Sequence, residues 1–451
     1  MTIKYSEQQP SERVRELIAE TSRITETGEI PKRIHNDPEV HEVELERIFG
    51  QTWVLVGHET EIPEPGDYAK RYIGDSPFIF VRDEGGEIRV LFDSCRHRGT
   101  TVVRGEQGNT THFRCPYHNW TYKNTGELVG VPRKHECFKE LDTDEYGLQP
   151  APKVDTYGGL VFATLSDTAP ALGEYLGDFT WYLDLLFKST EGKMEVVGEP
   201  IRWEVDTNWK IGADNFTGDS YHTPATHRSI LDLNVFPPEL SGERSERSGV
   251  DVTDCSGHSG MVAYFEDRTA LGLPESLYTG ERLSEAQAEL ADGLVDFVGT
   301  IFPNCSILQA PFTPDPDSRE IARFLNVRKW RPVGPDTTEI WNWILVPEAA
   351  SDEFKDQAYD AGISTFSVAG NFEVDDFAVW DGIAEAAGCT FTKQNEPTSN
   401  YQMSMDGMGE ANDISGEWPG PGTVYDTNFE DGTLRTFYDS WSRAMSGEPI
   451  Q

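Results

Sequence analysis

Apolar residues recur at helical spacing along the first, largely polar part of the chain. Within residues 8–27 they stand at four positions that would share one face of a helix: Val14, Leu17, Ile18 and Ile24. Residues 38–50 predict a second helix, ended by Gly50. We therefore expect residues 1–44 to form a helical segment that packs on the domain formed by the later part of the chain.

The pattern changes at Trp53, after which short β-rich runs alternate with turns of Gly, Asp and Pro. The runs lie at residues 52–59, 78–83, 88–95 and 160–165. Runs of this length with frequent turn residues predict strands. We expect a small all-β domain over residues 45–165, followed by a linker in residues 165–172.

From residue 166 onward, helical and strand patterns alternate irregularly. Helices are predicted at 180–188 and 351–366, paired strands at 194–210, and longer strands at 321–333 and 338–348. Such a mixture is typical of an α+β domain with an antiparallel sheet. Residues 166–451 are therefore predicted to form a second, larger domain.

Composition excludes several classes of protein. Hydrophobic residues make up 37% of the 451 residues, which excludes global disorder. The net charge of −40 opposes binding to nucleic acid or to an anionic membrane surface. No stretch approaches the roughly 20 apolar residues of a membrane-spanning helix. Six cysteines are too few for a disulfide framework in a chain of this length, so we expect a cytoplasmic location.

Two short segments each supply one Cys and one His. They are Cys95-Arg96-His97 and, 17 residues later, Cys115-Pro116-Tyr117-His118. Thiolate and imidazole ligands suit zinc or an iron–sulfur cluster. Structural zinc sites usually place two Cys on one arm and two His on the other, whereas both arms here are mixed. A [2Fe–2S] cluster with two Cys on one iron and two His on the other takes such an order.

The string that follows Cys95 resembles the Rieske iron–sulfur motif. The likeness includes Arg98-Gly99 after the first His and Trp120 after the second. Imidazole ligands raise the reduction potential of such a cluster, which suits a one-electron relay. The remaining cysteines show no ligand spacing and are expected to be small buried hydrophobes: Cys137, Cys255, Cys305 and Cys389.

A second group of metal-binding residues lies in residues 215–227, NFTGDSYHTPATH. His222 and His227 would stand about 140° apart on a regular helix, so both reach one ion only if the helix is widened or broken. Pro224 lies between them and donates no backbone hydrogen bond, so we expect a π-bulge or break there. Two His and a carboxylate from residues 371–376 would leave open positions on iron for O₂. Taken separately, these residues also fit a satisfied core cluster and a solvated acidic face.

In their order along the chain, these motifs resemble the catalytic α subunit of Rieske non-haem iron aromatic ring-hydroxylating dioxygenases. The likeness covers about residues 40–445, and its motifs are the Rieske domain, N-F-x-G-D-x-Y-H-x4-H, F-P-N and F-E-x-D-D. The resemblance implies two ligand sets. Those of the cluster are Cys95, His97, Cys115 and His118, and those of the mononuclear iron are His222, His227 and Asp376.

The resemblance also implies a fold, an electron path and partners. The fold is a Rieske β domain beside a helix-grip catalytic domain with a curved antiparallel sheet. Asp219 matches the carboxylate that links a cluster His of one subunit, here His118, to an iron His of the next, here His222. Relatives form α₃ or α₃β₃ assemblies and take electrons from NADH or NADPH through a reductase and a ferredoxin. The chain has no G-x-G-x-x-G fingerprint after a strand, so separate redox partners are expected.

Three functions are compatible with these motifs. The first is cis-dihydroxylation of an aromatic ring with O₂, as the resemblance implies. The second is a Rieske aromatic monooxygenase or O-demethylase, which keeps both metal sites and inserts one oxygen atom. The third is an electron-transfer protein with a degenerate C-terminal domain. The third predicts a broken set of iron ligands, whereas all three positions are intact here.

The substrate pocket is expected to be lined by small and aromatic side chains near the ligands: Asn215, Phe216, Thr223, Ala225, Asn304, Phe366 and Phe372. A carboxylate substrate would favour a buried cation. Only Arg228 lies beside the ligands in sequence, and we expect it to pair with surface acids. The pattern therefore favours an aromatic hydrocarbon, or an aromatic acid whose carboxylate stays at the pocket mouth.

The charge balance predicts adaptation to concentrated salt. The chain has 78 acidic residues but only 13 Lys beside 25 Arg. Salt would screen the mutual repulsion of these acidic groups, so the melting temperature is expected to rise as KCl is increased into the molar range. Thermal denaturation at several KCl concentrations measures this, and a melting temperature that does not rise with KCl contradicts the hypothesis.

Overall fold

The computed structural model describes residues 9–232, 248–254, 256–265, 272–313, 320–405, 413–427 and 429–448. They divide into two units. One is Phe49–Leu172, and the other combines the described residues before Phe49 with those from Gly173 onward. These boundaries fall close to the expected domain boundaries after residues 44 and 165, which stay predictions. Among the described residues, no helix has the length and apolar character needed to cross a membrane.

The first unit consists of three small antiparallel sheets, which confirms the predicted all-β domain. Their strand orders are β5(Ile88–Phe92)–β4(Ser76–Arg82)–β3(Asp67–Ile73)–β6(Gln107–Asn109), β10(Lys153–Tyr157)–β11(Leu160–Thr164)–β2(Val54–His58), and β7(His112–Arg114)–β8(Thr121–Lys123)–β9(Leu128–Gly130). Short helices complete the unit: η2 (Glu59–Glu61), α4 (Lys134–Cys137) and η3 (Thr143–Tyr146). Its core includes Leu91, Phe113 and Trp120, and the thiols of Cys95 and Cys115 pack into it. Each predicted cluster-binding arm is therefore held to the core of the first unit by its own buried cysteine.

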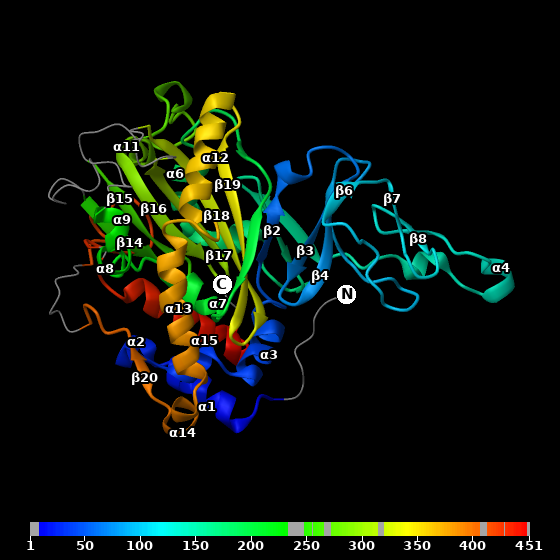
Figure 1. Cartoon of the computed structure of the whole chain (residues 1–451), viewed down its shortest axis with the longest axis horizontal. Helices are drawn as coiled ribbons and strands as arrows, with labels where there is room; N and C mark the ends of the chain where they lie inside the picture. Colours follow the sequence, from blue (N-terminus) through cyan, green and yellow to red (C-terminus); the bar gives the residue numbers. More distant parts are fainter. Residues whose placement is uncertain are drawn as a thin grey trace. The chain divides into compact units, whose positions relative to one another are not determined.

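The second unit is built around one nine-stranded sheet (Figure 1), which confirms the predicted antiparallel sheet. Its strand order is β12(Met194–Val196)–β19(Thr337–Pro347)–β18(Ala322–Gly334)–β17(Cys305–Phe312)–β16(Leu294–Ile301)–β15(Ser259–Tyr264)–β14(Ser248–Thr253)–β21(Thr423–Tyr425), and β13 (Ile201–Val205) also pairs with β19. The predicted pairing of two strands within residues 194–210 is wrong. β12 and β13 lie one after the other on the same edge of β19. The Val197 amide donates to the Ile344 carbonyl between them (2.8 Å), which keeps the chain on that edge.

Three helices cover one face of this sheet: α7 (Trp209–Asn215), α12 (Asp352–Phe366) and α13 (Glu373–Gly388). Gly212 of α7 lies against the Trp330 ring, where an added methyl group would meet the ring at 2.5 Å. The Trp380 ring of α13 packs on the same indole, 5.6 Å between centroids. Gly362 of α12 lies against Ile344, which pairs with Asn326 of β18. Positions 326 and 330 point to the same side of the strand, so all three helices share this face.

The N-terminal helices belong to the second unit. The helix expected over residues 8–27 is divided into α1 (Glu12–Thr21) and α2 (Ile24–Thr27), and the second expected helix is α3 (Pro38–Arg47). Ser11 caps α1, because its hydroxyl accepts from the Val14 amide, and the buried face of α1 packs on α15 (Gly432–Ser446). The other elements of the unit are β1 (Glu29–Pro31), η1 (Lys32–His35), α5 (Leu172–Leu176), η4 (Gly177–Phe179), α6 (Thr180–Phe187), α8 (Thr223–Thr226), α9 (Arg228–Asp232), η6 (Glu275–Leu277), α11 (Glu285–Gly293), α14 (Thr390–Asn395) and β20 (Thr398–Asn400).

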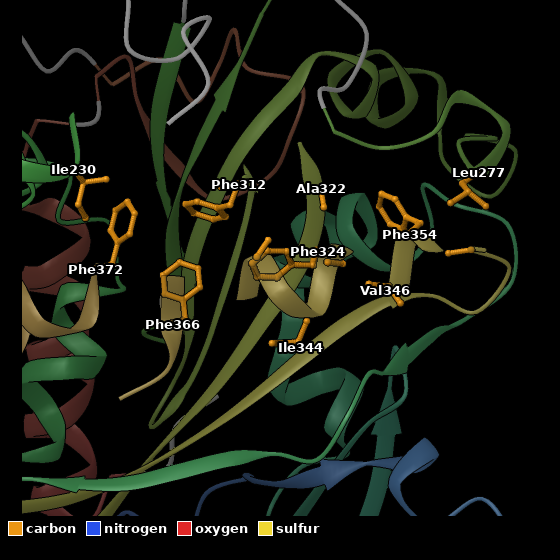
Figure 2. Close-up of a cluster of buried hydrophobic side chains, with 14 residues drawn as sticks. Ile230, Leu277, Phe312, Ala322, Phe324, Ile344, Val346, Phe354, Phe366 and Phe372 are labelled. Atoms are coloured by element: carbon orange, nitrogen blue, oxygen red, sulfur yellow. The ribbon is translucent and has the colours of Figure 1, made fainter. Parts of the chain in front are cut away.

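An aromatic cluster fills the space between the sheet and the facing helices (Figure 2). Phe312 of β17 makes edge-to-face contacts with Phe366 at the end of α12 and with Phe372 before α13, at centroid distances of 5.1 and 5.6 Å. Phe324 of β18 and Ile230 of α9 close the cluster. Edge-to-face pairs of this kind add to the energy of apolar burial. The cluster therefore fixes the place where α13 begins.

A buried carboxylate joins three distant segments of the second unit. Oε1 of Glu44 on α3 accepts from Lys210 Nζ (2.5 Å) on α7 and from the Trp441 indole N–H (2.8 Å) on α15. Its Oε2 accepts from the Trp209 indole N–H (2.9 Å). Both charged side chains have no exposed surface. Burial lowers the pKa of Lys210, and the Glu44 charge opposes that shift.

We expect Glu44→Gln to destabilise the second unit strongly. The variant leaves the Lys210 ammonium buried without a counter-charge, a loss of about 3–5 kcal/mol in the free energy of unfolding. Chemical denaturation followed by tryptophan fluorescence measures it. The control is Glu26→Gln, which removes the exposed pair of Arg23 and Glu26 and is expected to cost about 0–1 kcal/mol. Equal midpoints for the two variants would contradict the role assigned to Glu44.

Candidate metal centres

The two mixed Cys–His arms of the first unit are tight turns. One follows β5 and the other follows β7. In the first, the Gly99 amide donates to the Cys95 carbonyl (2.8 Å), and Gly99 has φ +80°. In the second, the Asn119 amide donates to the Cys115 carbonyl (3.0 Å), and Asn119 has φ +59°. A left-handed residue soon after each His reverses the chain, and Gly and Asn are the residues that best tolerate this conformation.

The structure sorts the four side chains of the arms into like pairs. Nδ1 of His97 lies 3.1 Å from Nδ1 of His118. The thiols of Cys95 and Cys115 contact each other, and burial together with this neighbour raises the pKa of Cys115. Trp120 stacks on the His97 ring at 5.0 Å, with an interplanar angle of 7°. Each arm thus contributes one member to each pair.

This arrangement distinguishes between the two metals that the sequence leaves open. A single zinc ion requires its ligand atoms close together around one point. Among the residues that the structure describes, His, Cys, Asp and Glu form only one group with three ligand atoms within 4.8 Å of one another, and the four residues of the arms do not belong to it. Two thiols at one end and two imidazoles at the other fit the two irons of a Rieske cluster.

In the second unit, His222 and His227 lie at the two ends of the four-residue helix α8. Their ring centroids are 5.2 Å apart. The expected break at Pro224 is wrong in position, because Pro224 lies in the first turn of α8, where its missing N–H is not needed. Regular helix ends at the histidines instead, and this brings two residues at spacing i, i+5 to the same point.

The third ligand atom comes from the first turn of α13. Oδ1 of Asp376 lies 3.3 Å from Nε2 of His227 and 3.9 Å from Nε2 of His222. These three residues are the group whose ligand atoms all lie within 4.8 Å. Asp376 Oδ1 and His227 Nδ1 are buried and make no hydrogen bond. Two imidazoles and one carboxylate gathered on one side of a point fit a mononuclear iron site with open positions.

Two further carboxylates flank the histidines. Oδ2 of Asp219 lies 3.2 Å from Nδ1 of His222, and Oδ2 of Asp375 lies 3.7 Å from Nδ1 of His227. Burial lowers the pKa of His222, but the Asp219 carboxylate outweighs it, so the pKa is raised overall. The Asp219 carboxylate therefore orients the His222 ring and raises its basicity.

The structure brings some of the expected pocket residues to this site and separates others. Nδ2 of Asn215 lies 3.4 Å from Nε2 of His222, and the Phe372 ring lies 4.7 Å from that of His227. Phe366 lies beside Phe372 in the aromatic cluster (Figure 2). Three others differ from these: Thr223 is half-buried, Ala225 is exposed, and Asn304 is buried in the β16–β17 turn, where its amide donates to the Trp330 carbonyl (2.8 Å). Their role in the pocket stays a prediction.

Sequence reasoning missed Arg328 of β18. Its guanidinium is fully buried, forms an ion pair with Glu373, and lies 4.7 Å from the ring of Phe216 and 5.0 Å from that of Phe366. Burial lowers its pKa to about 9, and the charge of Asp376 opposes that shift. No motif marks this residue, and it lies far in sequence from every predicted ligand. The sequence signal is the polar pair Asn326 and Arg328 at alternate positions, flanked at the same spacing by the apolar Phe324 and Trp330.

The cysteines outside the arms differ from the sequence prediction. Cys305 is buried as expected, but Cys137 and Cys389 are exposed. Cys137 lies in α4, which has no buried residue, and Cys389 lies directly before the short helix α14. Cys255 lies outside the described residues.

Comparison with known proteins agrees with this pair of sites. The Rieske [2Fe-2S] domain family matches residues 52–153, and the ring hydroxylating alpha subunit (catalytic domain) family matches residues 191–447. The chain is 35% identical over 430 residues to the N,N-dimethyl phenylurea N-demethylase subunit alpha of Sphingobium sp. (strain YBL2), with 93% of this chain and 92% of that protein covered. It is 33% identical over 433 residues to the biphenyl 2,3-dioxygenase subunit alpha of Rhodococcus jostii (strain RHA1), with 93% and 89% covered.

A solved structure gives the same picture for the fold. The crystal structure of naphthalene 1,2-dioxygenase from Rhodococcus sp. bound to indole is 40% identical in sequence and superposes with a TM-score of 0.91, covering 97% of this chain and 99% of that one. Fold, sites and relatives agree. The chain therefore belongs to the family of ring-hydroxylating dioxygenase alpha subunits, oxidoreductases that carry a Rieske [2Fe–2S] cluster and a mononuclear iron.

Proposed function

We propose that this chain binds an aromatic ring beside the mononuclear iron and adds both atoms of O₂ to adjacent ring carbons, giving a cis-dihydrodiol. The observation that carries the proposal is the group of His222, His227 and Asp376 next to an aromatic cluster that reaches the site through Phe372. Three ligands on one side leave positions for O₂ on the other. A flat apolar substrate suits the adjoining aromatic surface.

The iron supplies O₂ activation when bound, and the protein supplies binding, orientation and exclusion of water. His227 and Asp376 are almost completely buried, so bulk water has little access to them. The Asn215 amide and the Asp219 carboxylate hold the His222 ring from two sides. The Phe372 ring packs against His227 and presents an apolar surface to the substrate. Cys95, His97, Cys115 and His118 would hold the cluster that supplies the electrons.

Electrons are proposed to reach the iron through Asp219. In an α₃ or α₃β₃ assembly, its carboxylate would accept from His118 of a second copy while it contacts His222. In support, Asp219 lines an open groove of about 670 Å³ together with Asn215, Tyr221 and Asp431. Tyr221, 64% exposed, adds a free aromatic surface beside it. The cluster would be reduced from NADH or NADPH through a ferredoxin and a reductase, in the cytoplasm.

The substrate is proposed to be an uncharged aromatic compound. A substrate carboxylate would require a cation free to pair with it. Arg328 is a buried cation that interacts electrostatically with Asp376, and Glu373 already neutralises it. An aromatic acid would therefore have to keep its carboxylate at the pocket mouth.

Oxidative demethylation is a second candidate. The relative from Sphingobium, 35% identical, is named as an N-demethylase of a dimethyl phenylurea. That activity would use both metal sites and insert one oxygen atom into the methyl group, after which the product loses formaldehyde. An uncharged phenylurea needs no cation to pair with, so it is also compatible with an Arg328 that Glu373 already neutralises.

A single turnover under ¹⁸O₂ tests the proposal. Chemically reduced protein with both metals verified is mixed with aromatic hydrocarbons, aromatic acids and N-methylated phenylureas, and products are identified by mass spectrometry. Two labelled atoms in one dihydrodiol are expected. Formaldehyde formed together with a demethylated product, or a singly labelled product, would favour the second candidate. The absence of product from every compound would contradict both.

Asp219→Ala is expected to leave both metals bound and to abolish coupled turnover, because the carboxylate between the two imidazoles is lost. Metal content is measured by elemental analysis, and oxidation of the reduced cluster is followed optically after mixing with O₂ and substrate. The control is Asp356→Ala, at an exposed position on α12, which should behave as the parent protein. Loss of iron from Asp219→Ala would assign the residue a purely structural role.

A further inference from the structure

The first turn of α13 lacks the usual helix cap. Phe372 precedes the helix and its side chain makes no capping hydrogen bond, although this turn carries the proposed iron ligand Asp376. Caps normally satisfy and fix the first backbone amides of a helix. Here carboxylate side chains hold the turn in place instead. Glu373 pairs with Arg328, and Asp375 accepts from the Ser229 hydroxyl (3.1 Å).

Arg328 is held rigidly in the middle of the sheet. On β18 it pairs with Ser306 of β17 on one side and with Asn342 of β19 on the other. Its Nε donates to Oδ1 of Asn326 (2.9 Å). The rings of Phe216 and Phe366 contact its guanidinium, as described above. These strand, hydrogen-bond and ring contacts hold the Arg328 guanidinium in one position, so a side chain that pairs with it is also held in place.

Through Glu373, Arg328 binds α13, the helix that carries Asp376. Glu373 is 1% exposed at its side chain, and it stands three residues before Asp376, so both lie on the same face of α13. The charge of Arg328 also acts on Asp376 directly. The ion pair therefore connects a fixed point of the sheet to the helix turn that aims the carboxylate at His222 and His227.

We infer that Arg328 and Glu373 form a positioning pair that holds Asp376 in place for iron. The inference rests on the ligand role proposed for Asp376. Glu373 fixes the first turn of α13 against β18 and thereby sets the 3.3 Å separation of Asp376 Oδ1 from His227 Nε2. Residues that orient metal ligands from behind typically change metal affinity by roughly 10–100-fold when they are removed.

Metal binding by the apo protein tests this without relying on turnover. Glu373→Gln keeps the shape of the side chain and removes the ion pair, and Co(II) replaces Fe(II) because its visible spectrum reports ligand geometry. We expect roughly 10–100-fold weaker Co(II) binding and an altered spectrum, with unchanged far-UV circular dichroism. Glu373→Asp, which keeps the charge on a shorter side chain, is expected to bind more weakly than the parent and provides the test if Glu373→Gln does not fold.

The matched control is Glu339→Gln. It removes the pair of Arg331 Nη1 and Glu339 Oε2 (2.7 Å), which joins β18 to β19 on the face of the sheet opposite to that of Arg328. Its Co(II) affinity should equal that of the parent. Affinity of Glu373→Gln within twofold of this control would overturn the inference.

Two further variants separate the explanations. Arg328→Met with Glu373→Met removes both charges, and affinity should stay low if the pair acts by positioning. Recovery to parent affinity would assign the loss to the uncompensated charge of Arg328 and would overturn positioning. Asp376→Ala should lose Co(II) binding. If it binds as the parent does, the proposed ligand set is wrong, and that outcome is distinct from failure of the pair alone.

Discussion

The buried carboxylate of Glu44 on α3 binds side chains of α7 and α15. The proposed iron site depends on α7. Three donors converge on its two oxygens, which offsets the cost of burying Lys210 beside it. α7 leads directly into Asn215 and the loop that carries His222. The geometry of the proposed iron site therefore depends on a contact with the first fifty residues of the chain, although no proposed ligand lies there.

The mononuclear centre leaves one proposed ligand atom buried without a protein partner. This atom is Oδ1 of Asp376, which lies 3.3 Å from Nε2 of His227. Buried polar atoms without partners cost free energy in the metal-free chain. Iron bound at this oxygen would recover that cost and so contribute to folding as well as to chemistry. The stability of the second unit and its iron would then be energetically coupled.

The local pattern of apolar and polar residues predicted most of the architecture. It did not predict which strands and side chains pair across long distances in the sequence. Apolar spacing identified α1, α6 and α12, and motif order identified the residues that meet at both centres. Strand partners are set by contacts across the sheet, which explains why β12 and β13 were expected to pair with each other rather than with β19. The Arg328–Glu373 pair was missed for the same reason, because an ion pair between distant segments leaves no spacing to detect. The position of the break near Pro224 was misjudged because the helix there is too short to need one.

Because the two histidines lie at either end of α8, the length of this segment determines how their rings are placed. Four helical residues set the angle and rise between His222 and His227, and each added or removed residue would turn one ring by about 100° relative to the other. The side chains in between are less constrained, since Ala225 faces solvent. The interval therefore acts as a spacer. An insertion or deletion would move one imidazole away from the other, whereas a substitution at a solvent-facing position would leave the spacing of the two rings unchanged.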